Sequence, residues 1–236
     1  MEEIKREYYE NGQIEREIYH ICGKYHREDG PACIFYYRNG KIEQKTYYVN
    51  DICHREDGPA EIRYYKNGKI KIEQYCMNGK CHNENGPAYV EYYEDGSIWH
   101  EIFFLNNKHY RKNGPAVIRY YENGLIEAER YYKHDKPHRE DGPAEIRYHK
   151  NGKIKFEYYY INGEVYRENG AGIIWYYESG KIKEELYCLN NVWHRECGPA
   201  LIRYNNNGQI EKKEYWLNGI KCDILQEMVI RGLEKD

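Results

Sequence analysis

Residues 59–86 read PAEIRYYKNGKIKIEQYCMNGKCHNENG, and this pattern returns every 28 residues along the 236-residue chain. Complete copies begin at Pro31, Pro59, Pro87, Pro115, Pro143, Ala171 and Pro199, and an incomplete copy begins near residue 3. Repeats of this length bury their apolar side chains only by stacking on neighbouring copies. We therefore expect a single repeat array over residues 1–222.

Each copy contains a first Asn-Gly-type turn between two strands. Glycine fills the tenth position of all eight copies, as at Gly68, because it accepts a positive φ at little cost. Tyr and Ile columns, represented by Tyr64 and Ile70, flank this turn without exception and favour β-strands. A two-residue loop would pair Tyr65 with Ile70, whereas a three-residue loop with a glycine bulge would pair Tyr64 with Ile70. We favour the bulged loop because it keeps the two invariant columns together.

The strand before this turn has one face that is typical of a core, because Ala60, Ile62 and Tyr64 alternate with other side chains. Beyond the turn, Glu73 lies out of phase with Ile70, so a second irregularity is required between these two residues. The sequence alone does not place it.

A second turn follows at Asn78-Gly79, where a two-residue loop would set Tyr75 opposite His82 as an aromatic cross-strand pair. The Arg-Glu-Asp-Gly-Pro segment that closes several copies predicts a further turn, since proline fixes φ and has no amide proton. Each copy therefore adds two main strands, and the residues around His82 form a short extension.

The expected fold is all-β: an elongated antiparallel β-meander of about eight stacked hairpin repeats. Residues 223–236 break the period, and apolar residues behind Asp223 predict a short C-terminal capping helix with this aspartate as its N-cap. Such a helix would cover the last exposed strand edge, or alternatively dock on a second chain.

The composition supports a thin sheet in a reducing, aqueous compartment. Tyrosine (29 residues) far outnumbers phenylalanine (4 residues), and a large ring with a polar tip suits a sheet that is never far from water. The 36 basic and 39 acidic residues are intermingled, with a formal charge of −3. Neither a membrane-spanning apolar stretch nor an apolar signal segment occurs, so we expect a soluble, intracellular protein.

Eight cysteines occupy scattered columns and form no Cys-x-x-Cys motif. Cys53 and Cys81 share a column in successive copies, and two strands per copy would place them about 10 Å apart. That distance exceeds the limit of about 7 Å between the Cα atoms of a disulfide. We therefore expect eight free thiols.

A column of histidines raises the question of a metal site or a catalytic centre. Its members are His26, His54, His82, His138 and His194. All ligands of one zinc ion lie about 2.0–2.3 Å from it, whereas neighbouring members of this column would be about 10 Å apart. No serine or cysteine nucleophile recurs beside them, and no glycine-rich phosphate loop is present. We expect a structural column, with no catalytic, metal or cofactor site.

Aromatic and arginine side chains recur on the second face of the strand before the first turn, and they form the candidate interaction face. Its members are Tyr37, Tyr65, Tyr93, Tyr121, Tyr177, Arg63, Arg119, Arg147, Arg203 and Trp175. Tyr, Trp and Arg dominate the energetic centres of protein interfaces, so protein recognition is one interpretation. A solvated face with incidental aromatics is the other. Nucleic-acid stacking is disfavoured, because Phe35 and Glu91 share the arginine column and the chain is slightly acidic.

The motif Tyr-Tyr-x-Asn-Gly-Lys-Ile, followed by a second Asn-Gly-Lys and by His-Arg-Glu-Asp-Gly-Pro-Ala, resembles the variant MORN-type repeats. These are abundant in large DNA viruses of amoebae and also occur in phage and bacterial proteins. The resemblance covers residues 3 to about 222. It implies an elongated β-meander that binds proteins or membranes as a scaffold.

These observations give three functional hypotheses. The first is a non-enzymatic scaffold for a protein partner, which would be a host protein if the source is viral; its location would then be host cytoplasm, host nucleus or virion. The second is a peripheral membrane module, and the third is a nucleic-acid-binding rod. Self-association through the C-terminal helix or the array ends is a further expectation. Salt dependence separates the hypotheses, because phosphate and anionic-lipid contacts weaken with salt.

Overall fold

The computed structural model describes residues 2–222, of which the side chains are described from residue 3 onward. The chain divides into two compact units. Unit 1 comprises Met1–Lys112 with Glu122–Gly124, and unit 2 comprises Asn113–Tyr121 with Leu125–Asp236. The predicted capping helix over residues 223–236 lies outside the described residues.

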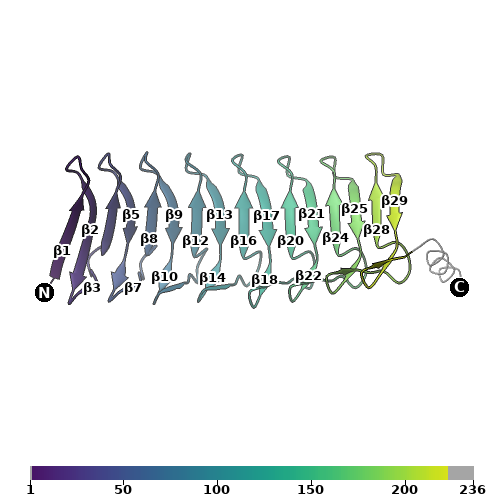
Figure 1. Ribbon diagram of the computed structural model, residues 1–236, viewed down its shortest axis with the longest axis horizontal. Helices are drawn as coiled ribbons and strands as arrows, with labels where there is room; N and C mark the ends of the chain where they lie inside the picture. Colours follow the sequence, from purple (N-terminus) through teal and green to yellow (C-terminus); the bar gives the residue numbers. More distant parts are fainter. Residues whose placement is uncertain (1, 223–236) are drawn as a thin grey trace. The chain divides into compact units, whose positions relative to one another are not determined.

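Each unit is an antiparallel meander in which consecutive hairpins follow one another in chain order (Figure 1). In unit 1 the strands pair successively in the order β1 (Glu2–Tyr8), β2 (Ile14–Ile21), β4 (Cys33–Tyr36), β5 (Ile42–Thr46), β8 (Glu61–Tyr64), β9 (Ile70–Gln74), β12 (Tyr89–Tyr92) and β13 (Ile98–Ile102). In unit 2 they pair in the order β16 (Val117–Tyr120), β17 (Ile126–Arg130), β20 (Glu145–Tyr148), β21 (Ile154–Tyr158), β24 (Ile173–Tyr176), β25 (Ile182–Leu186), β28 (Leu201–Tyr204) and β29 (Ile210–Glu214). The expected all-β meander of stacked hairpins is confirmed.

A smaller hairpin follows each main hairpin, at the strand ends opposite the first turns (Figure 1). In unit 1, β3 (Lys24–Tyr25) pairs with the end of β2, and the further pairs are β6 (Tyr48–Val49) with β7 (Ile52–Cys53), β10 (Cys76–Met77) with β11 (Lys80–Cys81), and β14 (Phe104–Leu105) with β15 (Lys108–His109). In unit 2 the pairs are β18 (Tyr132–Lys133) with β19 (Lys136–Pro137), β22 (Tyr160–Ile161) with β23 (Glu164–Val165), β26 (Cys188–Leu189) with β27 (Val192–Trp193), and β30 (Trp216–Leu217) with β31 (Ile220–Lys221). The predicted short extension is therefore a hairpin of its own.

The first turn has the bulged geometry favoured by the sequence. Tyr64 pairs with Ile70, while the Gly68 amide donates to the Tyr65 carbonyl at 2.8 Å and Gly68 has φ of +94°. A type I turn followed by a left-handed glycine gives this three-residue loop.

The second irregularity predicted between Ile70 and Glu73 lies at Lys71, because the next paired residue after Ile70 is Ile72, opposite Arg63. This bulge returns Glu73 to the face that carries Tyr64.

The second turn is the predicted two-residue loop. Asn78 and Gly79 have φ of 51° and 75°, which is the pair of positive values required by a type I′ turn. The His82 amide donates to the Tyr75 carbonyl at 3.1 Å, so these residues do face each other. Other copies place Asn or Asp after the asparagine with the same positive φ, as at Asn50 and Asp51.

The strand register sorts the side chains of each unit onto two faces, because residues directly opposite each other on paired strands point the same way. The "repeated face" carries the isoleucine and glutamate columns, which alternate in unit 2 along Ile118, Glu129, Ile146, Glu157, Ile174, Glu185, Ile202 and Lys213. The "variable face" carries columns whose residues differ from copy to copy. Columns that recur and columns that vary are thus physically separated.

The core is thin and lies along the alanine and isoleucine columns. Ala60, Ala88 and Ala144 have no exposed surface, and the isoleucines that alternate with the glutamate column in unit 2, such as Ile118 and Ile146, are 7–8 % exposed. Burial of each isoleucine contributes about 1.5–3 kcal/mol, which adjacent copies share. In the part of the chain that the structure describes, no helix is long and apolar enough to cross a lipid bilayer.

Replacing Gly68 with Val tests the first turn. A Cβ atom at Gly68 meets nothing within 4 Å, so the cost comes from its positive φ, which β-branched residues adopt with difficulty. We expect the free energy of unfolding to fall by about 1–3 kcal/mol, measured by denaturant titration. Gly68→Asn is the matched control and should lose clearly less, because Asn tolerates the left-handed region. Equal losses in the two variants would show that φ is not the limiting constraint.

Candidate functional site

A hydrogen bond between tyrosine and glutamate links successive copies on the repeated face. The Tyr92 hydroxyl donates to Glu73 Oε2 at 2.6 Å, and the residues are 19 apart in the chain. The same bond joins Tyr36 to Glu17, Tyr148 to Glu129, Tyr176 to Glu157 and Tyr204 to Glu185 at 2.6–2.8 Å. Burial, together with this carboxylate, raises the pKa of the tyrosines, that of Tyr36 to about 12. The invariant tyrosine column is therefore a structural element.

In most copies an arginine, rather than a histidine, packs against the aromatic ring that precedes the small hairpin. The Arg55 guanidinium carbon lies 4.1 Å from the centre of the Tyr47 ring, and that of Arg139 lies 4.1 Å from the Tyr131 ring. The Arg55 Nε donates to Asp57 Oδ1 at 2.7 Å, which fixes the loop that follows. The sequence predicted a ring pair between tyrosine and histidine, and this arginine stacking was missed.

Four histidines of the column accept a backbone hydrogen bond from the next copy, namely His26, His54, His138 and His194, whereas Nδ1 of His82 has no hydrogen-bond partner among the described residues. The Asn78 amide donates to Nδ1 of His54 at 3.1 Å, and the Asn162 amide donates to Nδ1 of His138 at the same distance. An accepting Nδ1 leaves the proton on Nε2, which faces Glu140 Oε1 at 3.2 Å in the His138 copy. The structural function predicted for this column agrees with these contacts.

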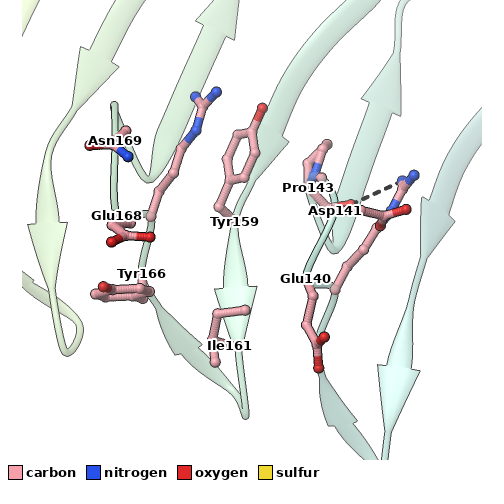
Figure 2. A pocket seen from close by; sticks show the side chains of 11 residues that line it. Glu140, Asp141, Pro143, Tyr159, Ile161, Tyr166, Glu168 and Asn169 are labelled. Carbon is pink, nitrogen blue, oxygen red and sulfur yellow. Dashed lines mark hydrogen bonds and ion pairs between the residues drawn. The ribbon is translucent and has the colours of Figure 1, made fainter.

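Open grooves lie between consecutive loops that begin with Arg-Glu and end with Gly. One of them, of about 690 Å³, has Tyr159 and Ile161 between the loop that carries Glu140 and Asp141 and the loop that carries Glu168 (Figure 2). A similar groove lies between the loop that carries Glu168 and the next loop, which carries Glu196. Another lies in unit 1, between the loops that carry Glu28 and Glu56. Carboxylates at the rim could accept hydrogen bonds from cationic groups. The lining residue types repeat, so the grooves offer much the same chemistry in each copy.

The predicted tyrosines of the candidate interaction face hold copies together through their hydroxyls. Tyr37, Tyr65, Tyr121 and Tyr177 donate to the carbonyl oxygens of Tyr64, Tyr92, Tyr148 and Tyr204 at 2.6–2.7 Å. In the remaining copy, the Tyr93 ring lies 6.2 Å from the Trp99 ring. These side chains are half-buried, and burial raises the pKa of Tyr37, Tyr65 and Tyr121. The hydroxyl groups of these four hydrogen-bonded tyrosines therefore stabilise the fold.

The predicted arginines and Trp175 lie on the variable face. In unit 2 they occupy one cross-strand row, which runs Arg119, Ala128, Arg147, Phe156, Trp175, Glu184, Arg203 and Lys212. Arg63 occupies the equivalent row of unit 1, opposite Gln44 and Ile72. Register thus brings four of the predicted residues together within unit 2.

A second row completes the variable face of unit 2. It runs Val117, Arg130, Glu145, Tyr158, Ile173, Leu186, Leu201 and Glu214. The two rows together carry five basic residues (Arg119, Arg130, Arg147, Arg203 and Lys212) and three acidic ones (Glu145, Glu184 and Glu214), a net charge of +2. This face is basic although the whole chain carries −3.

An aromatic cluster lies at the centre of this face. The Trp175 ring is 4.7 Å from the Phe156 ring and 6.5 Å from the Tyr158 ring, and Tyr158 stacks on Tyr160 at 5.8 Å. The Arg147 guanidinium lies 5.1 Å from the Phe156 ring. The sequence pattern did not reveal Phe156, Tyr158 and Tyr160, because the residue type in their columns varies among the copies.

Ion pairs surround the aromatic cluster and fix the arginines. Glu145 Oε1 accepts from Arg130 at 3.0 Å and from Arg147 at 3.1 Å, while Glu184 accepts from Arg203 Nε at 2.7 Å. In unit 1, Arg63 Nε donates to Glu61 at 2.6 Å. The guanidinium groups are thus held in fixed orientations with part of their surface open to solvent.

The variable face of unit 1 is polar and rich in thiols. Gln44 Nε2 donates to Thr46 at 3.0 Å, and Gln74 Nε2 lies 2.9 Å from the Cys81 sulfur. Within residues 2–222, no group of three or more His, Cys, Asp and Glu side chains is arranged to hold a metal ion. The two units therefore present different chemistry on the same framework.

Replacing Tyr92 with Phe removes the hydroxyl that Glu73 accepts. A half-buried carboxylate then loses a charge-assisted hydrogen bond, so we expect the free energy of unfolding to fall by about 1–2 kcal/mol in denaturant titration. Tyr64→Phe is the matched control, because Lys45 stands where the glutamate would be, with its Nζ 5.8 Å from the Tyr64 ring centre. The control should lose less than half as much. Equal losses would contradict the stabilising function of the glutamate bond.

Alkaline pH should weaken unit 1 through Tyr36. Burial and the bond to Glu17 raise its pKa from about 10 to about 12. The unfolded chain therefore releases this proton at lower pH than the folded chain does, so its stabilising contribution is full below about pH 10 and is lost as pH rises towards 12. Denaturant midpoints measured across this range should fall more steeply for the wild type than for Tyr36→Phe. Parallel curves would contradict the assignment.

The comparisons with known proteins agree with this architecture. Six segments match the family described as MORN repeat variant: residues 4–21, 32–50, 60–76, 88–106, 144–162 and 173–190. A comparison with curated proteins gave no match. Each matched segment contains the two main strands of one copy, together with the bulged first turn between them. The chain is therefore a MORN-type repeat protein.

Proposed function

We propose that this chain is a non-enzymatic scaffold that binds a protein partner through its variable face. The observation that carries the proposal is the separation of the two faces. Recurrent columns, such as those of Tyr92 and Glu73, make contacts between copies, whereas the columns of the variable face are free to differ. MORN repeats commonly serve as scaffolds for proteins or membranes, which supports a scaffold function for this chain.

Unit 2 offers the stronger recognition surface. Trp175, Tyr158 and Arg147 lie together, and Trp, Tyr and Arg are the side chains that most often dominate binding energy. The guanidinium groups are held by carboxylates before binding, so little side-chain entropy is lost when a partner docks. With a net charge of +2 around an aromatic centre, this face fits a protein segment that presents apolar and acidic side chains.

The grooves between loops are a weaker basis for recognition. Their lining recurs in successive copies, so a ligand bound there would find several equivalent positions. Such sites favour repetitive ligands held by many weak contacts. The variable face instead has one arrangement of side chains per copy, which permits one defined position of a partner.

A membrane surface and a nucleic acid are the competing classes of partner. Both would bind through phosphate groups, and their binding would fall steeply between low and moderate salt. An interface centred on Trp175 and Tyr158 should change little over this range. We propose an intracellular location, and a host protein as the partner if the source is viral.

Affinity capture with matched variants tests the proposal. The wild-type chain, Trp175→Arg and Glu178→Lys are used as baits in lysate at low and moderate salt. Arg occupies the Trp175 column in other copies, as at Arg147, so this exchange preserves the fold. Glu178→Lys, in an exposed turn, also adds positive charge and matches Lys150 in its own column.

We expect a discrete protein on the wild type and on Glu178→Lys at both salt concentrations, and at least about 30-fold weaker capture by Trp175→Arg. Thermal unfolding of all three baits confirms that the fold is intact. Equal capture by Trp175→Arg would show that the aromatic cluster is not the binding site. Retention of lipid or nucleic acid alone, lost at moderate salt, would favour the competing classes.

A further inference from the structure

Three cysteines from two adjacent copies meet on the variable face of unit 1. Cys76 and Cys81 are directly opposite each other in the hairpin formed by β10 and β11. Cys53 and Cys81 share a column, and their spacing predicts no disulfide between them. Cys76 lies in a different column, between these two residues in the chain.

The strand register suits a disulfide between Cys76 and Cys81. Met77 and Lys80 close the two-residue turn, so the next pair outwards, Cys76 with Cys81, is of the non-hydrogen-bonded type. Cα atoms in such a pair lie about 4.5 Å apart, within the range of about 4.4–6.8 Å that disulfides occupy. All eight cysteines are free thiols in the structure, as the sequence predicted.

Backbone hydrogen bonds bring Cys53 to the same cluster. The Gly79 amide donates to the Cys53 carbonyl at 2.9 Å, and the Arg55 amide donates to the Cys76 carbonyl at 3.1 Å. These two bonds fasten consecutive small hairpins, and the Cys53 and Cys76 thiols are hydrogen-bonded to each other. Gln74 Nε2 lies 2.9 Å from the Cys81 sulfur and 3.5 Å from the Cys76 sulfur.

Accessibility and charge distinguish the three thiols. Cys76 is only 4 % exposed, whereas Cys53 and Cys81 are half-buried and can be reached from solvent. The hydrogen bond from Cys76 lowers the pKa of Cys53, so its thiolate forms more readily than those of its neighbours. The hydrogen bond with Cys53 and burial raise the pKa of Cys76 to about 11, against the opposing effect of the bond with Cys81.

This arrangement is specific to one copy. The columns of Cys76 and Cys81 hold Tyr48 and Cys53 in the preceding copy and Phe104 and His109 in the following one. The hairpin framework therefore does not need thiols here. Within residues 2–222, these three cysteines are also not part of a group arranged to hold a metal ion.

We propose that Cys53, Cys76 and Cys81 form an oxidation site for hydroperoxides, whose product is a disulfide between Cys76 and Cys81. The Cys53 thiolate attacks one peroxide oxygen, the O–O bond breaks, and Cys53 becomes a sulfenic acid while the second oxygen leaves as water or an alcohol after protonation. The Cys76 thiol then attacks the Cys53 sulfur, forms an S–S bond and expels the hydroxyl as water. Cys81 attacks the Cys76 sulfur, and Cys53 leaves as a thiol.

The consequence is a local change on the variable face of unit 1. The bridge removes the two thiol groups that Gln74 contacts and ties the strands of this hairpin covalently. Peroxide would thereby alter one surface of the scaffold while leaving the hydrogen bonds of the repeated face in place. The proposal concerns a reaction of this chain alone and does not require the binding partner proposed above.

Peptide mapping after oxidation tests the proposal. The reduced full-length chain is treated with hydrogen peroxide, quenched with N-ethylmaleimide and digested with trypsin. Cleavage after lysine and arginine places Cys76 in peptide 72–80, Cys81 in peptide 81–108 and Cys53 in peptide 46–55. We expect peptides 72–80 and 81–108 to be linked, with a loss of about 2 Da from the intact chain.

The variants assign each step. Cys81→Ser should accumulate a link between peptides 46–55 and 72–80, and Cys76→Ser should form neither link. Cys53→Ser should slow formation of the final disulfide by at least about ten-fold, and Cys53→Val, a residue found in that column at Val165, checks that this effect is not due to misfolding. The double variant Cys22→Ser/Cys197→Ser, which removes two exposed thiols, should behave as the wild type.

Two results would overturn the proposal. One is oxidation of the exposed Cys22 and Cys197 while peptides 72–80 and 81–108 stay unlinked. The other is an unchanged rate in both Cys53 variants, which would remove Cys53 from the reaction.

Discussion

Each copy of this repeat depends on polar contacts with the next copy, because a thin sheet buries too little apolar surface to hold its strands in place. The hydroxyl of Tyr65 reaches the carbonyl of Tyr92, and that of Tyr92 reaches the carboxylate of Glu73. Tyrosine supplies both bonds with a long side chain and a terminal donor, and His149 takes the place of the Tyr65 type in its copy, 3.2 Å from the Tyr176 carbonyl. Phenylalanine would pack in either position but would remove the side-chain bond to the neighbouring copy, which explains why tyrosine so greatly outnumbers it.

These contacts also explain why the period of the sequence is so strict. Each bond joins residues 19 or 27 apart, so an insertion in one copy would displace a donor from its acceptor in the neighbouring copy. The type I′ turn at Asn78-Gly79 and the bulge at Lys71 keep the strands in phase within a copy. Local turn chemistry and contacts between copies therefore impose the same 28-residue length.

The sequence predicted the features that depend on backbone conformation. Glycine at a fixed position and the Tyr64 and Ile70 columns were enough to derive the bulged turn, and Asn78-Gly79 gave the second one. What it could not supply were contacts between residues in different columns, whether within one copy, such as Arg55 on Tyr47, or between copies, such as Cys53 with Cys76. Column-by-column comparison finds identity, whereas these contacts depend on the register that the bulge sets.

One position shows how much the residue type can vary among copies when the hydrogen bonds between copies are kept. Gly172 replaces the alanine found in the other complete copies, because a Cβ there would lie 2.8 Å from the Val165 side chain. The side chain of Val165, which branches at Cβ, is thus accommodated by a smaller residue beside it. The same tolerance separates the two units: Phe156 and Trp175 occupy, in unit 2, columns that hold Ile72 and Glu91 in unit 1. A framework stabilised on one face leaves the other free to acquire aromatic, charged or thiol chemistry without loss of the fold.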